Sequence, residues 1–223
     1  MKTRSYLPTC TALMFSLFTL CACASNTRLE PSSEHAEGLL EIIKVLDKRH
    51  YRSIELNDEF SRQLLARYLN LLDPGKSYFL RSDITDFERW STSLDDELQD
   101  GDLDHVFVIY NRIRSRITER MEANIALLES DQGFDFDIEE TLSLDPELRE
   151  WFADENEADN FWRKRTKDAL LRLLLSEKEA EAARELLIKR YKNQLSLISQ
   201  QSADDSFEVY ANAVVGIYDP HTS

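Results

Sequence analysis

Cysteine is almost absent from this chain. Its three cysteines, Cys10, Cys21 and Cys23, all lie within the first 23 of 223 residues. A disulfide framework is therefore excluded from the folded part of the protein. Glycine and proline are also scarce, with five residues of each, which leaves little material for the tight turns of β-hairpins. These shortages favour a helical protein without disulfide bonds.

Positive charge and long apolar runs are also lacking. The chain has 27 Lys and Arg against 42 Asp and Glu, a formal charge of −15. Phosphate backbones would repel such a chain, so no nucleic-acid partner is expected. We interpret the acidity as a solubilising surface, and attraction of a basic partner is the alternative. The apolar run from Leu13 to Leu20 is too short to span a bilayer, which takes about 20 residues.

The N-terminus has the order of a secretory signal peptide. Lys2 and Arg4 precede the apolar run 13–20, and small residues follow it. Leu20-Cys21-Ala22-Cys23 is typical of a lipobox, in which residues 1–22 are removed and Cys23 carries lipid. Residues 23–33 would then form a tether. Ala24, where an inner-membrane signal would often place Asp, favours anchoring in the outer membrane.

Ordinary cleavage is the alternative, because Ala22-Cys23-Ala24 also has the small-x-small pattern of signal peptidase sites. Cleavage after Ala24 would release a periplasmic protein that begins at Ser25. In both cases we expect an exported protein of the cell envelope.

Apolar residues recur at intervals of three and four along the remaining chain, which predicts an all-α irregular or orthogonal bundle of about seven helices. Asp73-Pro74-Gly75 and Gly101 interrupt the pattern. The second helix should bury one apolar face, made by Phe60, Leu64, Tyr68 and Leu71 and extended by Leu65, Leu69 and Leu72. The expected helices cover about 39–50, 57–72, 82–98, 102–128, a segment ending near 175, 176–198 and 205–218.

The charge changes sign near residue 160. Residues 130–160 contain twelve carboxylates and one base, Arg149, and we interpret them as an exposed connection with Trp151 and Phe152 tucked in. Asp145-Pro146 can begin a short helix, and Ser176 with Glu179 has the pattern of a capping box. The run 163–165, Arg-Lys-Arg, is interpreted as solubilising charge, and docking on the acidic stretch is the alternative.

No catalytic, cofactor-binding or metal site is predicted, and Cys23 is the one modification site. Gly75-Lys76-Ser77 follows a helix and lacks the preceding glycine of a phosphate-binding loop. The four histidines do not cluster as metal ligands do, so they are interpreted as solvent-facing or capping residues. The four arginines of the longest expected helix are interpreted as solvated charge: Arg112, Arg114, Arg116 and Arg120.

Three stretches together resemble one known family. They are His50-Tyr51-Arg52, the block from Arg67 to Asp73 (Arg-Tyr-Leu-Asn-Leu-Leu-Asp), and Tyr218-Asp219-Pro220-His221-Thr222. In this order and spacing they are similar to the N-terminal helical domain of the tail-specific proteases, the carboxy-terminal processing peptidases of the bacterial periplasm. The likeness would make residues 34–218 that domain and residues 219–223 the start of a linker.

The resemblance implies a role inside a larger enzyme. In the family this domain precedes a PDZ domain and a Ser–Lys protease core, which have no counterpart here, so this chain alone should be inactive. The family's helical domain frames the substrate chamber and offers surface to adaptors. The expected partners are therefore the missing PDZ and protease portion, an adaptor or an unfolded protein substrate. The alternatives are a stand-alone envelope lipoprotein acting as an adaptor or scaffold, and an independent enzyme that uses carboxylates.

Overall fold

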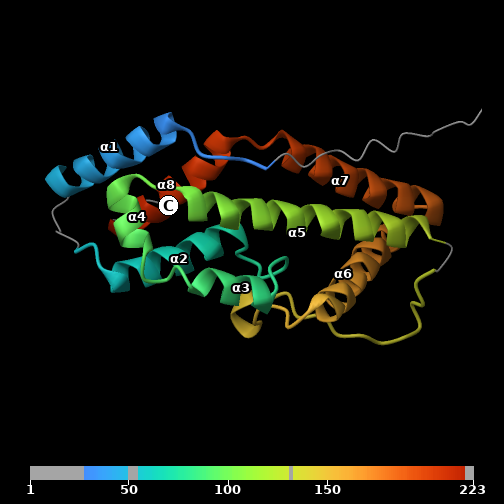
Figure 1. Ribbon diagram of the computed structural model, residues 1–223. Helices are drawn as coiled ribbons and strands as arrows, with labels where there is room; N and C mark the ends of the chain where they lie inside the picture. Colours follow the sequence, from blue (N-terminus) through green and yellow to red (C-terminus); the bar gives the residue numbers. More distant parts are fainter. Residues whose placement is uncertain (1–27, 50–54, 131–132, 219–223) are drawn as a thin grey trace, which may run out of the picture.

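The computed structural model describes residues 28–49, 55–130 and 133–218, and these residues fold into a helical bundle (Figure 1). The described part contains no strand, only an isolated parallel bridge between Leu80 and Phe152. The all-α prediction is confirmed, with eight α-helices and one 3-10 turn. They are α1 (Ser33–Arg49), α2 (Asp58–Leu72), α3 (Arg81–Glu88), α4 (Leu94–Asp100), α5 (Asp104–Glu129), η1 (Pro146–Leu148), α6 (Glu155–Leu175), α7 (Ala180–Gln200) and α8 (Ala203–Tyr218).

Helix α2 begins and ends where its sequence predicts. The side-chain oxygen of Asn57 accepts the backbone N–H groups of Glu59 and Phe60, at 3.0 and 3.1 Å, and so caps the helix. Tyr68 and Leu69 are buried as expected, but Leu72 is only half-buried and Leu71 is 40% exposed. The expected burial of Leu71 is wrong, because helical spacing gives the direction of a side chain and not the extent of the neighbour that covers it.

The described part of the chain has two large apolar cores and a small third cluster of Leu80, Phe152 and Ala158. The first lies among α1, α2, α4, α8 and the N-terminal half of α5, and the rings of Tyr68 and Tyr210 meet edge to face at its centre, 5.3 Å apart. The second core lies among the C-terminal half of α5, α6 and α7, and contains Met121, Trp162 and Leu187.

Helix α5 is the common wall of both cores. It has 26 residues, so it is about 39 Å long, and it runs along the length of the bundle in Figure 1. Ile117, near its middle, packs against both cores. The prediction that this segment forms the longest helix is confirmed.

The expected helix 82–98 is wrong, because the structure has two helices there. Helix α3 stops at Glu88 and α4 starts at Leu94. The intervening sequence contains Ser91, Thr92 and Ser93, whose hydroxyls favour caps and turns over helix interiors. Ser93 Oγ lies 2.7 Å from Glu97 Oε1 in the first turn of α4. Gly101 then ends α4 in the left-handed conformation, with φ 73°.

The acidic connection is shorter than expected, because α6 already begins at Glu155 behind its cap Asp154. Phe152 is buried and Trp151 half-buried, as predicted, and Asp145 caps the short turn η1. The end of α6 at Leu175 is confirmed. The capping box at Ser176 is wrong, because its hydroxyl donates to the Leu173 carbonyl of the preceding helix instead.

The last residues of the expected tether lie against the bundle. The side chain of Asn111, on α5, accepts the N–H of Leu29 at 2.9 Å and donates to its carbonyl at 2.8 Å.

Within the described ranges, no helix is both long enough and apolar enough to cross a membrane.

Candidate functional site

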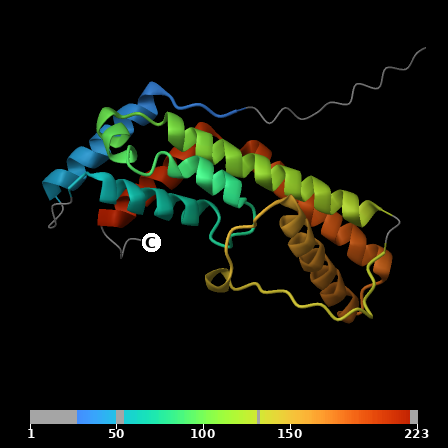
Figure 2. The same cartoon turned by 60° about the horizontal axis from the view of Figure 1, so that its bottom comes forward.

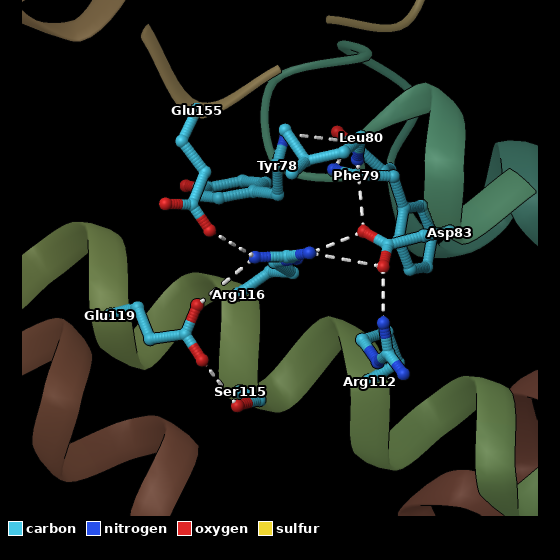
Figure 3. A network of polar contacts seen from close by, with 10 residues as sticks. Tyr78, Phe79, Leu80, Asp83, Arg112, Ser115, Arg116, Glu119 and Glu155 are labelled. Carbon is cyan, nitrogen blue, oxygen red and sulfur yellow. Dashed lines mark hydrogen bonds and ion pairs between the residues drawn. The ribbon is translucent and has the colours of Figure 1, made fainter. Parts of the chain in front are cut away.

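Asp83 belongs to the polar network drawn in the close view of Figure 3. Its side chain has no accessible surface, and it lies in the first turn of α3. One oxygen accepts the N–H of Leu80 at 3.0 Å and so caps the helix. Two arginines of α5 reach the same carboxylate: Arg116 through Nε at 2.9 Å and Nη2 at 3.1 Å, and Arg112 through Nη1.

These donors keep the buried carboxylate ionised. Burial alone would raise the pKa of Asp83, but hydrogen bonds from Arg116, from the Leu80 amide and from Arg112 hold it below its usual 3.8. The same contacts raise the pKa of Arg116 against the effect of its own burial. The bidentate geometry fixes the angle between α3 and α5 as well as the charge.

The arginine row continues to α6. Arg116 Nη1 lies 3.4 Å from Glu155 Oε1, and Arg120 Nη1 lies 2.6 Å from Asp159 Oδ1. Both carboxylates belong to the first turns of α6. The network therefore joins α3, α5 and α6 at one place along the bundle.

The interpretation of these arginines as solvated charge is wrong. Arg112, Arg116 and Arg120 are spaced by four residues and so lie on one face of α5. Arg114 points elsewhere, is 3% exposed, and donates to the Ile198 carbonyl at 3.4 Å. The four-residue spacing was the available signal for a common acceptor, but nothing local identifies Asp83 as that acceptor.

The basic run of α6 docks on the acidic connection. Glu140 accepts hydrogen bonds from Arg163 and, at 2.8 Å, from Lys167, and these two partners lower its pKa to about 2. Lys164 Nζ donates to the Thr141 carbonyl at 3.4 Å. The docking alternative is therefore correct for Arg163 and Lys164.

His35 is buried at the start of α1. The N–H of Ser32 donates to its Nδ1 at 3.0 Å, so Nε2 carries the proton and donates to Asp204 Oδ1 at 2.8 Å. The order Ser, His, Asp resembles a hydrolase triad. However, Ser32 Oγ accepts the His35 N–H at 3.3 Å as a helix cap, and the Asp204 side chain is 91% accessible. This arrangement caps α1 and ties it to α8.

The other candidate residues that the structure describes form no metal or phosphate site. His105 Nδ1 lies within hydrogen-bond distance of Glu97 Oε1, at 2.8 Å. No group of three potential metal-ligating side chains occurs in the described residues. After Gly75, the backbone N–H groups of Ser77, Tyr78 and Phe79 donate to the Asp73 carboxylate. The amides that would bind phosphate are therefore occupied. His50, His221 and the expected lipidation site Cys23 lie outside the described residues.

The block from Arg67 to Asp73 contacts the last helix. The half-buried guanidinium of Arg67 lies directly against Gly216 of α8, where an added Cβ would overlap it. Tyr218 ends the same helix and meets the ring of Phe60 at 6.1 Å. Helices α2 and α8, which carry the Arg67–Asp73 block and Tyr218, thus pack against each other. The Arg67 guanidinium would have to move to admit a side chain at position 216.

The sequence of this chain is similar to known proteins. Residues 42–223 match the family described as the tail-specific protease N-terminal domain. A tail-specific protease of Haemophilus influenzae (strain Rd) is 32% identical over 211 residues, which cover 91% of this chain and 30% of that protein. The chain therefore spans about a third of the length of this relative. With its all-α fold and a match over most of its length, the chain belongs to the tail-specific protease family as an N-terminal domain.

Proposed function

We propose that this chain is the non-catalytic, helical N-terminal part of a periplasmic tail-specific serine endopeptidase. The observation that carries the proposal is the family match over residues 42–223. The family's PDZ domain and Ser–Lys core would have to come from the sequence that follows this domain in full-length members. A nucleophilic serine requires an adjacent activating base, so we expect no protease activity from this domain without that core.

Its proposed role is to frame the chamber through which an unfolded substrate reaches the active site, and to offer surface to adaptor proteins. A frame has to keep its shape while a flexible chain passes. The bundle supports this role in two ways: α5 contributes to both cores, and the Asp83 network ties α3, α5 and α6 together.

A domain exchange tests the proposal. The matching N-terminal region of the Haemophilus influenzae protease is replaced by residues 28–223 of this chain, and cleavage of an unfolded test protein is measured. We expect the hybrid to cleave, and this chain alone to leave the same substrate intact. A soluble, folded hybrid without activity contradicts the assignment. So does cleavage by the purified chain that is abolished by substituting one of its residues.

We further propose that the mature protein is anchored in the outer membrane through lipid on Cys23, in the sequence Leu20-Cys21-Ala22-Cys23. The same feature supports the second candidate, a stand-alone envelope lipoprotein that acts as an adaptor or scaffold. The DNA downstream distinguishes the two. A reading frame for a PDZ domain and a Ser–Lys core supports the protease, and an unrelated gene supports the stand-alone lipoprotein.

A further inference from the structure

The acidic connection docks on the side of α6 that faces away from the bundle and forms a surface there. Residues 135–145, here called the strap, pass along α6 outside the bundle, and Figure 2 shows their path below that helix. Two lysines of α6 fix the strap: Lys167 donates to the Ile138 carbonyl at 3.0 Å, and Lys164 donates to the Thr141 carbonyl. The strap is therefore held in place along α6 instead of hanging free.

A groove of about 380 Å³ separates the strap from α6. Along the strap, apolar residues occupy positions 136, 138, 142 and 144, and this even spacing would place them on one side of an extended chain. These four side chains line the groove together with Leu171 of α6: Phe136, Ile138, Leu142 and Leu144. Ile138 is 57% exposed and Leu144 is 54% exposed. Apolar groups that line a groove and remain this accessible are typical of a surface that another molecule covers.

Apart from the Ile138 and Thr141 carbonyls and the Asp137 N–H, the main chain of the strap is largely unpaired. In the described residues, no hydrogen bond is donated by the backbone N–H groups from Glu139 to Leu144. The side chain of Glu140 is only 19% accessible, yet the residue as a whole is exposed, so much of its accessible surface is main chain. An open edge of this kind is a template on which an extended peptide can add by main-chain hydrogen bonds.

Charge indicates what kind of peptide fits. Five carboxylates of the strap and η1 form no ion pair within the described residues: Asp135, Asp137, Glu139, Asp145 and Glu147. Of these, Glu139 lines the groove, and the others are close to its lining residues in the sequence. Of the cations that face the groove, Lys167 and Arg172 are already paired with Glu140 and Asp168. Lys164 is bonded to a carbonyl. The net negative potential of the strap favours a cationic partner.

We propose that the strap and the groove bind an extended polypeptide segment in which apolar and basic side chains alternate. The apolar side chains enter the groove, the main chain pairs with the free edge of the strap, and the basic side chains meet the five carboxylates. This inference does not rest on the assignment to the protease, and it would hold equally for a chain that acts alone.

Synthetic peptides test the inference on the full chain. A fluorescent peptide of about ten residues that alternates leucine and lysine should bind, as measured by fluorescence anisotropy, and salt should weaken the binding. A peptide with glutamate in place of lysine should bind at least about tenfold more weakly. N-methylation of alternate backbone nitrogens should cause a similar loss, because it removes the paired N–H groups. Equal affinity for any of these peptides overturns the proposal.

A pair of variants locates the binding site. Leu144→Ser should reduce the affinity for the leucine-lysine peptide about tenfold, the change expected for losing an apolar contact worth about 1.4 kcal/mol. Leu197→Ser makes the same change at a leucine of α7 that is 65% exposed, and should bind like the wild type. Circular dichroism spectra establish that both variants are folded. Equal loss in both variants, or none in Leu144→Ser, would place any binding elsewhere and overturn the proposal.

Discussion

Replacing Asp83 by alanine should destabilise the bundle more than any other change of a single charge in the network. The carboxylate is fully buried and holds Arg112, Arg116 and the Leu80 amide. Removing one partner of a buried ion pair costs about 3–5 kcal/mol. The loss of stability is reduced here, because Arg112 is 39% accessible and Arg116 keeps its contact with Glu155. The lost helix cap increases it by about 1 kcal/mol. We expect about 3 kcal/mol in all.

Urea unfolding followed by circular dichroism measures this difference. With a slope of about 1–3 kcal/mol per molar urea, the midpoint should fall by roughly 1–3 M. Asp159→Ala is the comparison variant: it removes the partner of Arg120, whose side chain is 14% accessible, while the side chain of Asp159 itself is 64% accessible. That variant should lose less than Asp83→Ala, about 1–2 kcal/mol. Asp83→Ala that unfolds within about 0.5 kcal/mol of the wild type would refute the reasoning.

Acid provides a second test of the same residue. The folded-state pKa of Asp83 is below its usual value of 3.8, so its contribution is complete well above pH 4. That contribution is lost as the pH falls from about 4 through the folded-state pKa. The wild type should therefore lose more stability than Asp83→Ala over this interval. Parallel acid profiles would show that Asp83 is not ionised through pairing in the folded protein.

Three further outcomes are expected. Leu64→Ala should cost about 2–5 kcal/mol in a thermal melt, because Leu64 is fully buried, whereas Leu71→Ala should cost under about 1 kcal/mol. Gly216→Ala should be more favourable in an Arg67→Ala background, where alanine gains up to about 1 kcal/mol of helix propensity, than in the wild type, where the Arg67 guanidinium must move. An equal change in both backgrounds would disprove the contact. Mass spectrometry should find a mature N-terminus at Cys23 that carries acyl chains, and an unmodified terminus further along the chain would remove the lipid anchor.

The helix boundaries that the sequence predicted well are those set by local chemistry. Asn57 caps α2 through its own neighbours, and Gly101 ends α4 through a conformation that glycine adopts without strain. Such signals act within a few residues, so they can be recognised without knowing the fold. The hydroxyl residues at 91–93 were a signal of the same kind. They mark the break between α3 and α4, which the prediction of a single helix over 82–98 missed.

The polar network was not predictable in the same way. Asp83 and Arg116 are 33 residues apart in the sequence, and the first looks like any acidic residue near a helix start. Only the packing of α3 against α5 removes this carboxylate from water and gives the arginines their partner. The docking of Arg163 on Glu140 was easier to anticipate, because an acidic stretch and a basic stretch follow each other directly.

The position of α5 between two cores limits how the protein can change its length. One residue inserted near Ile117 would rotate everything beyond it by about 100° and advance it by 1.5 Å. Met121 and Leu128 would then turn away from α6 and α7 while Val106 and Ile109 stayed in place. Insertions in the middle of α5 should therefore destabilise the fold, and changes in length should be tolerated only in the connections between helices.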